Sequence, residues 1–138
     1  MSSGLSLAKG YAALIGVVLI VVGLLGFVSN PIVADPSANP FFVTGTVHNI
    51  VHLLTGALAL SVAFGLRGDQ QALGVVGLGA LYTVVLLLTL ISPNLFGILG
   101  ASPAYNVSAG DHLLHAALAV VSLGVGWTAR SQQPMPAR

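Results

Sequence analysis

The sequence contains no cysteine, which excludes disulfide bonds, thiolate nucleophiles, iron–sulfur clusters and zinc sites built from thiolates. It also contains no glutamate, and its only carboxylate side chains are Asp35, Asp69 and Asp111. A di-iron carboxylate site in a helix bundle needs several inward-facing glutamates, so that class of site is excluded as well. The net charge of +1 leaves no basic surface of the kind that binds nucleic acid.

Charged residues make up 5% of the chain, whereas hydrophobic residues make up 56%. A soluble domain carries about 25% charged residues, so this chain has too few of them to cover a water-facing surface. Its apolar segments are each near the roughly 20 residues that cross a bilayer as a helix. The sequence therefore predicts an all-α, polytopic membrane protein, with the lipid bilayer as its environment.

We expect a single four-helix membrane domain over residues 1–138 that ends in a polar tail, residues 130–138. The predicted transmembrane helices are at about 10–28, 43–66, 71–92 and 109–129. The first of them is longer than the apolar core of a signal peptide, about 7–15 residues, so we expect it to be retained.

The basic residues all lie on one side of this layout. Lys9 precedes the first segment, Arg67 lies in the short turn between the second and third, and Arg130 and Arg138 follow the fourth. Because cytoplasmic loops carry the excess of Lys and Arg, we expect a multi-pass protein of the inner (plasma) membrane with both termini in the cytoplasm.

The two halves of the chain resemble each other. Each half has an apolar segment, a long loop with an Asn–Pro or Pro–Asn pair, and a second apolar segment that opens with histidine. Aligning His52 with His115 places His48 against Asp111 and Asn49 against His112. This predicts a bundle built from two similar helical hairpins, related by an axis along the membrane normal.

Polar side chains occupy the first two turns of the second and fourth segments. His48 and His52 are spaced i,i+4, as are Asp111 and His115, so each pair shares a helix face, and small residues follow on the same face. Small residues let membrane helices approach closely, so we expect the two faces to meet and the polar groups to point into the bundle, near the outer leaflet. The predicted polar cluster consists of His48, Asn49, His52, Asn106, Asp111, His112 and His115.

The first interpretation of this cluster is structural. Ser108 and Asp111 match the Ser-x-x-Asp pattern of a capping box at a helix N-terminus. Asn49 and the histidines can form hydrogen bonds between helices, and Tyr82, in mid-span of the third segment, is expected to find a partner in the bundle for its hydroxyl. The protein would then be non-enzymatic, and either free-standing, a homo-oligomer or an accessory subunit of a larger membrane complex.

The second interpretation is a metal site. His48, His52, Asp111 and His115 offer the nitrogen and oxygen ligands that Zn²⁺ or a similar divalent ion binds.

Two more interpretations use the same residues. His52 and His115 could be the axial ligands of a haem, with Gly56 and Ala119 leaving room for the cofactor. The protein could also be a small transporter or proton-coupled module, in which Asp111 and the histidines line a pathway.

Two strings, HNIVHLLTG (48–56) and NVSAGDHLLH (106–115), resemble the motifs of a family of small bacterial four-span membrane proteins, known as domain of unknown function 4383. His112 departs from that pattern, because the family more often carries another polar or aromatic residue there. The resemblance implies a four-span fold in a membrane and supplies no activity. The matching positions are His48, Asn49, His52, Gly56, Asn106, Asp111 and His115.

Overall fold

The computed structural model describes residues 3–34, 40–95 and 107–132 of the chain. The predicted cluster residue Asn106 and most of the predicted tail, residues 133–138, lie outside the described residues. The elements are α1 (Ser3–Leu25), β1 (Val33–Ala34), β2 (Phe42–Val43), α2 (Thr46–Gly65), α3 (Gly68–Ile91) and α4 (Ala109–Ser131).

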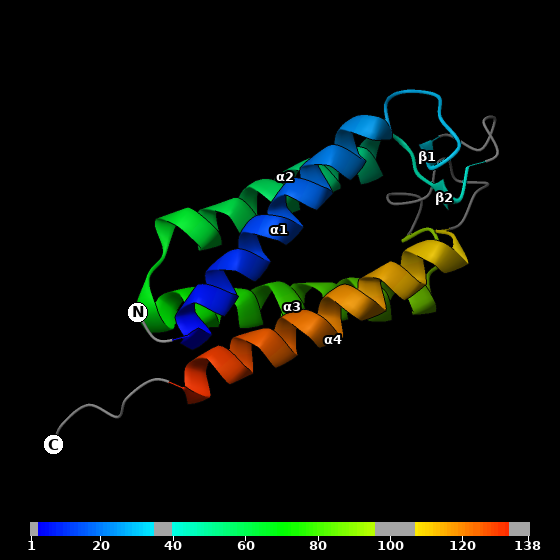
Figure 1. The fold of residues 1–138 in the computed structure, drawn as a ribbon. Helices are drawn as coiled ribbons and strands as arrows, with labels where there is room; N and C mark the ends of the chain where they lie inside the picture. The colour runs from blue at the N-terminus through cyan, green and yellow to red at the C-terminus, as the bar shows by residue number, and fades with distance from the viewer. Residues whose placement is uncertain (1–2, 35–39, 96–106, 133–138) are drawn as a thin grey trace, which may run out of the picture.

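The helices confirm the predicted fold class. All four are long and apolar enough to cross a membrane, so the chain is an all-α, four-span bundle. They pack as two hairpins, α1 against α2 and α3 against α4, as the similarity of the two halves predicts (Figure 1). α1 begins and α4 ends at the same end of the bundle, and the short β1–β2 pair lies at the opposite end (Figure 1).

Several helix boundaries differ from the predicted ones: α1 begins at Ser3 rather than near residue 10, and α2 begins at Thr46 rather than near residue 43. Polar side chains account for two further differences. α1 ends at Leu25 rather than near residue 28, since the Asn30 amide donates to the carbonyls of Leu25 at 3.0 Å and Val28 at 2.7 Å. α3 begins at Gly68 rather than near residue 71. Its Gln71 amide reaches back to the carbonyls that end α2, and so turns a polar stretch into the first turn of a helix.

Glycines set the close approach of the helices within each hairpin. A Cβ added to Gly56 would lie 2.9 Å from the Gly16 carbonyl oxygen, so the backbones of α1 and α2 touch at this point. A Cβ added to Gly126 would lie 2.7 Å from the Val76 backbone nitrogen, which gives the same result for α3 and α4. In a membrane, helices associate mainly through close packing, because burial away from lipid gives no hydrophobic driving force. Small residues permit this close packing.

The expectation that the small-residue faces of α2 and α4 meet each other is wrong for these glycines. Gly56 contacts α1 and Gly126 contacts α3. The closest packing is therefore within each hairpin, and the polar side chains of α2 and α4 have to span the interior between the two hairpins.

A two-residue parallel pairing covers the end of the bundle where the predicted polar cluster lies. Val33 pairs with Phe42 and Ala34 with Val43. A Cβ added to Gly110 would lie 3.1 Å from the Phe42 ring, so β2 packs against the first turn of α4. The pair thus fixes the loop after α1 next to the start of α4.

Candidate metal centre

Three histidines converge inside the bundle. His48 and His52 lie one turn apart on α2 with ring centroids 4.6 Å apart, and His115 of α4 lies across from them, 6.0 Å from His48. Each offers a ring nitrogen, and these three nitrogens all lie within 4.8 Å of one another. The side chains are only 1–2% exposed. The structure therefore brings together three of the four predicted metal ligands and both predicted haem ligands.

The ring nitrogens of His52 are buried, and neither has a hydrogen-bond partner among the described residues. The same holds for Nδ1 of His115. A neutral imidazole has one donor and one acceptor nitrogen, and leaving a buried polar group unsatisfied costs about 1–3 kcal/mol. Buried polar groups of native proteins are nearly always paired, so these nitrogens indicate a partner beyond the described residues.

The geometry of the three nitrogens suits a small ion. Zn²⁺ binds imidazole nitrogen at about 2.0–2.1 Å, which places tetrahedral ligands about 3.4 Å from one another. The three nitrogens lie within 4.8 Å of one another, so the rings would have to move closer by up to about 1.4 Å to hold such an ion. Neutral imidazole is a ligand that Zn, Cu, Fe and Ni accept.

Asp111, the fourth predicted ligand, is engaged at the start of α4. Its Oδ2 accepts hydrogen bonds from the Ser108 hydroxyl at 2.6 Å and the Ser108 backbone N–H at 3.1 Å, and its own N–H donates to the Ser108 hydroxyl oxygen at 3.1 Å. The predicted capping box is thus confirmed. The carboxylate is buried one turn before His115, where it offers a negative charge near the histidines rather than a ligand within their group.

Removal of the capping hydroxyl of Ser108 is expected to lower the stability of the protein moderately. Ser108→Ala deletes two of the three bonds of the capping box, and N-cap losses of this kind cost about 0.5–2 kcal/mol. We expect a lower thermal unfolding midpoint in detergent. Ser61→Ala is the matched control, because that hydroxyl only donates to the Ala57 carbonyl on an exposed face of α2. Equal midpoints for the two variants would contradict the role of the cap.

Two other members of the predicted polar cluster lie outside the group of three histidines. The Asn49 side chain is buried just beyond the end of α1, where a Cβ on Gly26 would overlap its amide. His112 is partly buried on α4, and its ring does not belong to the converging group.

Tyr82 of α3 contacts the site, and the sequence pattern does not predict this contact. Its ring centroid lies 5.8 Å from that of His115. Its hydroxyl donates to the Thr55 hydroxyl of α2 at 3.2 Å, which confirms the prediction that this hydroxyl has a partner in the bundle. Thr55 in turn donates to the His52 carbonyl at 3.2 Å. The sequence signal was present, because a lone tyrosine in mid-span has to bury its hydroxyl against a polar group.

The room that the haem interpretation expects beside Gly56 and Ala119 is filled by side chains. The space expected beside Gly56 is filled by α1, since a Cβ at Gly56 would lie 2.8 Å from the Ile20 side chain. Ala119 belongs to a buried hydrophobic cluster with Leu19, Tyr82 and Leu118. A large planar cofactor between His52 and His115 would have to displace these side chains, whereas a single ion would not.

The comparisons with known proteins bear on the fold. No curated protein and no solved structure matches the chain. A family model described as a domain of unknown function, DUF4383, matches residues 9–128. That range includes the three converging histidines and most of each membrane helix, and it agrees with the resemblance carried by the strings at 48–56 and 106–115. This multi-pass membrane protein therefore belongs to the DUF4383 family.

Proposed function

We propose that this protein binds one transition-metal ion, such as Zn²⁺, between α2 and α4. The observation that carries the proposal is the convergence of His48, His52 and His115, whose buried ring nitrogens lie within 4.8 Å of one another. The lack of a partner for either nitrogen of His52 among the described residues supports it, because a metal ion would satisfy the ligand nitrogen.

The local charge also favours a bound cation. Three neutral imidazoles leave the full positive charge of the ion in a region of low dielectric constant, where an uncompensated charge is costly. The Asp111 carboxylate lies on the same face of α4, one turn before His115, and offsets part of that charge. A tetrahedral ion would take a fourth ligand besides the three histidines, as in sites with three protein ligands.

The proposal concerns binding rather than enzymatic turnover. The three histidine side chains are 1–2% exposed, so a substrate would have to displace neighbouring side chains to reach an ion there. An ion alone needs no such space.

We further propose that the protein lies in the inner membrane with the histidines on the outer side. Lys9, Arg67 and Arg130 are near the ends of helices at the other end of the bundle from the histidines. The preference of positive charge for the cytoplasmic side would then place both termini in the cytoplasm and the proposed ion near the outer leaflet.

Counting metal ions tests the proposal. The full chain, extracted in mild detergent and equilibrated with micromolar Zn²⁺, is expected to retain about one ion per chain by mass spectrometry of the metal. His52→Ala and His115→Ala are expected to lose it, because each removes one of only three protein ligands. His112→Ala is the matched control, since it removes a histidine that lies outside the converging group.

Two results would overturn the proposal. One is a wild-type protein that retains no Zn²⁺, Cu²⁺ or Ni²⁺ after equilibration with each. The other is an equal loss of metal in His52→Ala and His112→Ala, which would show general binding by histidine. Circular dichroism of each variant distinguishes loss of a ligand from loss of the fold.

A further inference from the structure

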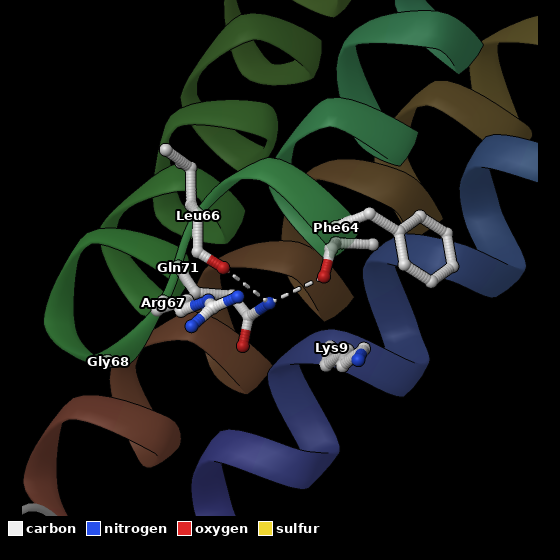
Figure 2. A pocket seen from close by; sticks show the side chains of 7 residues that line it. Lys9, Phe64, Leu66, Arg67, Gly68 and Gln71 are labelled. Carbon is white, nitrogen blue, oxygen red and sulfur yellow. Dashed lines mark hydrogen bonds between the residues drawn. The ribbon is translucent and has the colours of Figure 1, made fainter.

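A cavity of about 340 Å³ lies at the opposite end of the bundle from the histidines. It is formed by the start of α1, the end of α2 and the turn that leads into α3 (Figure 2). Its lining residues are Lys9, Ala63, Phe64, Leu66, Arg67, Gly68 and Gln71. The volume falls in the range of small-ligand sites, about 300–1,000 Å³.

The cavity has a positive charge that its own lining does not balance. Lys9 and Arg67 come from different elements and are both exposed, and no carboxylate belongs to the lining. Asp69 is close by in the sequence, but its Oδ1 accepts a hydrogen bond from Nε of Arg130 at 3.0 Å, in the one ion pair among the described residues. An anion is therefore the ligand that the charge of the cavity favours.

The base of the cavity is held in place by Gln71. Its side chain is 5% exposed, and its amide donates to the Ala63 carbonyl at 2.8 Å and the Leu66 carbonyl at 3.2 Å (Figure 2). These bonds satisfy carbonyl groups at the end of α2 that have no partner within the helix. The turn that carries Arg67 is thus tied to the end of α2 with or without a ligand.

One wall of the cavity is apolar and exposed at the surface of the bundle. Phe64 is 64% exposed, and Nζ of Lys9 lies 5.4 Å from the centroid of its ring. A positively charged cavity next to an exposed aromatic ring at the end of a membrane bundle matches a ligand with an anionic head and an apolar body. Basic pockets between membrane helices bind anionic lipid headgroups for this reason.

We propose that this cavity binds the phosphate group of an anionic ligand between Lys9 and Arg67. Arg offers a planar set of donors that matches phosphate oxygens, and Lys adds a mobile point charge. Phosphatidylglycerol in the surrounding leaflet and free phosphate share this chemistry. The exposed Phe64 favours the lipid, because an acyl chain can lie against its ring.

The test compares three probes on the full chain in detergent micelles. Phosphatidylglycerol, phosphatidylcholine and inorganic phosphate are each titrated, and binding is measured by native mass spectrometry and by the shift of the thermal midpoint. We expect phosphatidylglycerol to bind at least 10-fold more tightly than the zwitterionic lipid, since each basic residue near a membrane surface contributes on the order of five-fold in affinity. Lys9→Gln combined with Arg67→Gln should then weaken binding by about 25-fold.

The matched control is Asp69→Asn combined with Arg130→Gln, which removes a basic residue at the same end of the bundle that does not line the cavity, together with the carboxylate it pairs with. Binding that survives in this control and is lost when Lys9 and Arg67 are both replaced supports the site. Tight binding of inorganic phosphate with the same dependence would identify free phosphate as the source. Equal affinity for the two lipids without phosphate binding, or equal losses in the control and in Lys9→Gln combined with Arg67→Gln, would overturn the proposal. All the substituted side chains are exposed, so the variants are expected to fold.

Discussion

Addition of Zn²⁺ to the detergent-solubilised protein is expected to raise its thermal unfolding midpoint by roughly 10 °C, and His52→Leu is expected to abolish this rise. A ligand that binds only the folded state at 100 times its Kd stabilises it by about 2.7 kcal/mol. For a chain of this size, 1 kcal/mol corresponds to about 3–5 °C. Differential scanning fluorimetry of the wild type and of His52→Leu, with and without Zn²⁺, measures the rise and its loss.

The same variant separates a metal site from a structural hydrogen-bond network when the metal is removed. With EDTA present, His52→Leu replaces a buried ring without a described hydrogen-bond partner by an apolar side chain, so the midpoint is expected to stay level or rise. A structural network in which His52 joins two helices predicts the reverse, because the substitution would then lower the free energy of unfolding by about 1–3 kcal/mol. His112→Leu is the control, and we expect it to retain the full response to Zn²⁺. A midpoint that falls in EDTA, together with no Zn²⁺ response in the wild type, would exclude the metal site.

The fold could be predicted from the sequence because lipid leaves few choices. An apolar segment near 20 residues has to satisfy its backbone internally, and a helix is the form that does so along one segment. What the sequence could not supply was where a side chain ends a helix. The bonds from the Asn30 amide to the end of α1 depend on a loop conformation that apolar periodicity does not encode.

The candidate site could be predicted in part. The i,i+4 spacing alone places His48 and His52 on one face, and the structure keeps them there. The choice of residues from α4 depends on the rotation of that helix, which is set by its packing against α3 at Gly126. Asp111 and His115 lie on the same face, but Asp111 is drawn into the cap by Ser108. Two physical demands compete for the Asp111 carboxylate, and the sequence contains the spacing of both, the capping box with Ser108 and the shared face with His115, without deciding between them.

The close glycine contacts within the hairpins predict a large loss of stability when one of these glycines is replaced. Gly126→Val is expected to destabilise the bundle by about 1–3 kcal/mol, as overpacking does in other tight interiors. Its Cβ would lie 2.7 Å from the Val76 backbone nitrogen and 3.0 Å from the Ala72 carbonyl oxygen, which cannot move aside as a flexible side chain could. Gly124→Val is the matched control two residues earlier on α4, where an added Cβ meets nothing within 4 Å.

The effect of Gly126→Val should extend to the proposed metal centre. α4 holds His115 in place by packing against α3, so a helix pushed away or rotated at Gly126 would also move this ring relative to His48 and His52. We therefore expect Gly126→Val to reduce the Zn²⁺-induced rise of the midpoint as well as the midpoint itself, whereas Gly124→Val should leave both near the wild-type values. A Gly126→Val protein that unfolds earlier but keeps the full Zn²⁺ response would show that the ion is held without His115 being fixed by this packing. If both variants lose the Zn²⁺-induced rise of the midpoint, the loss is caused by the added side chain on α4 and not by the contact between α4 and α3.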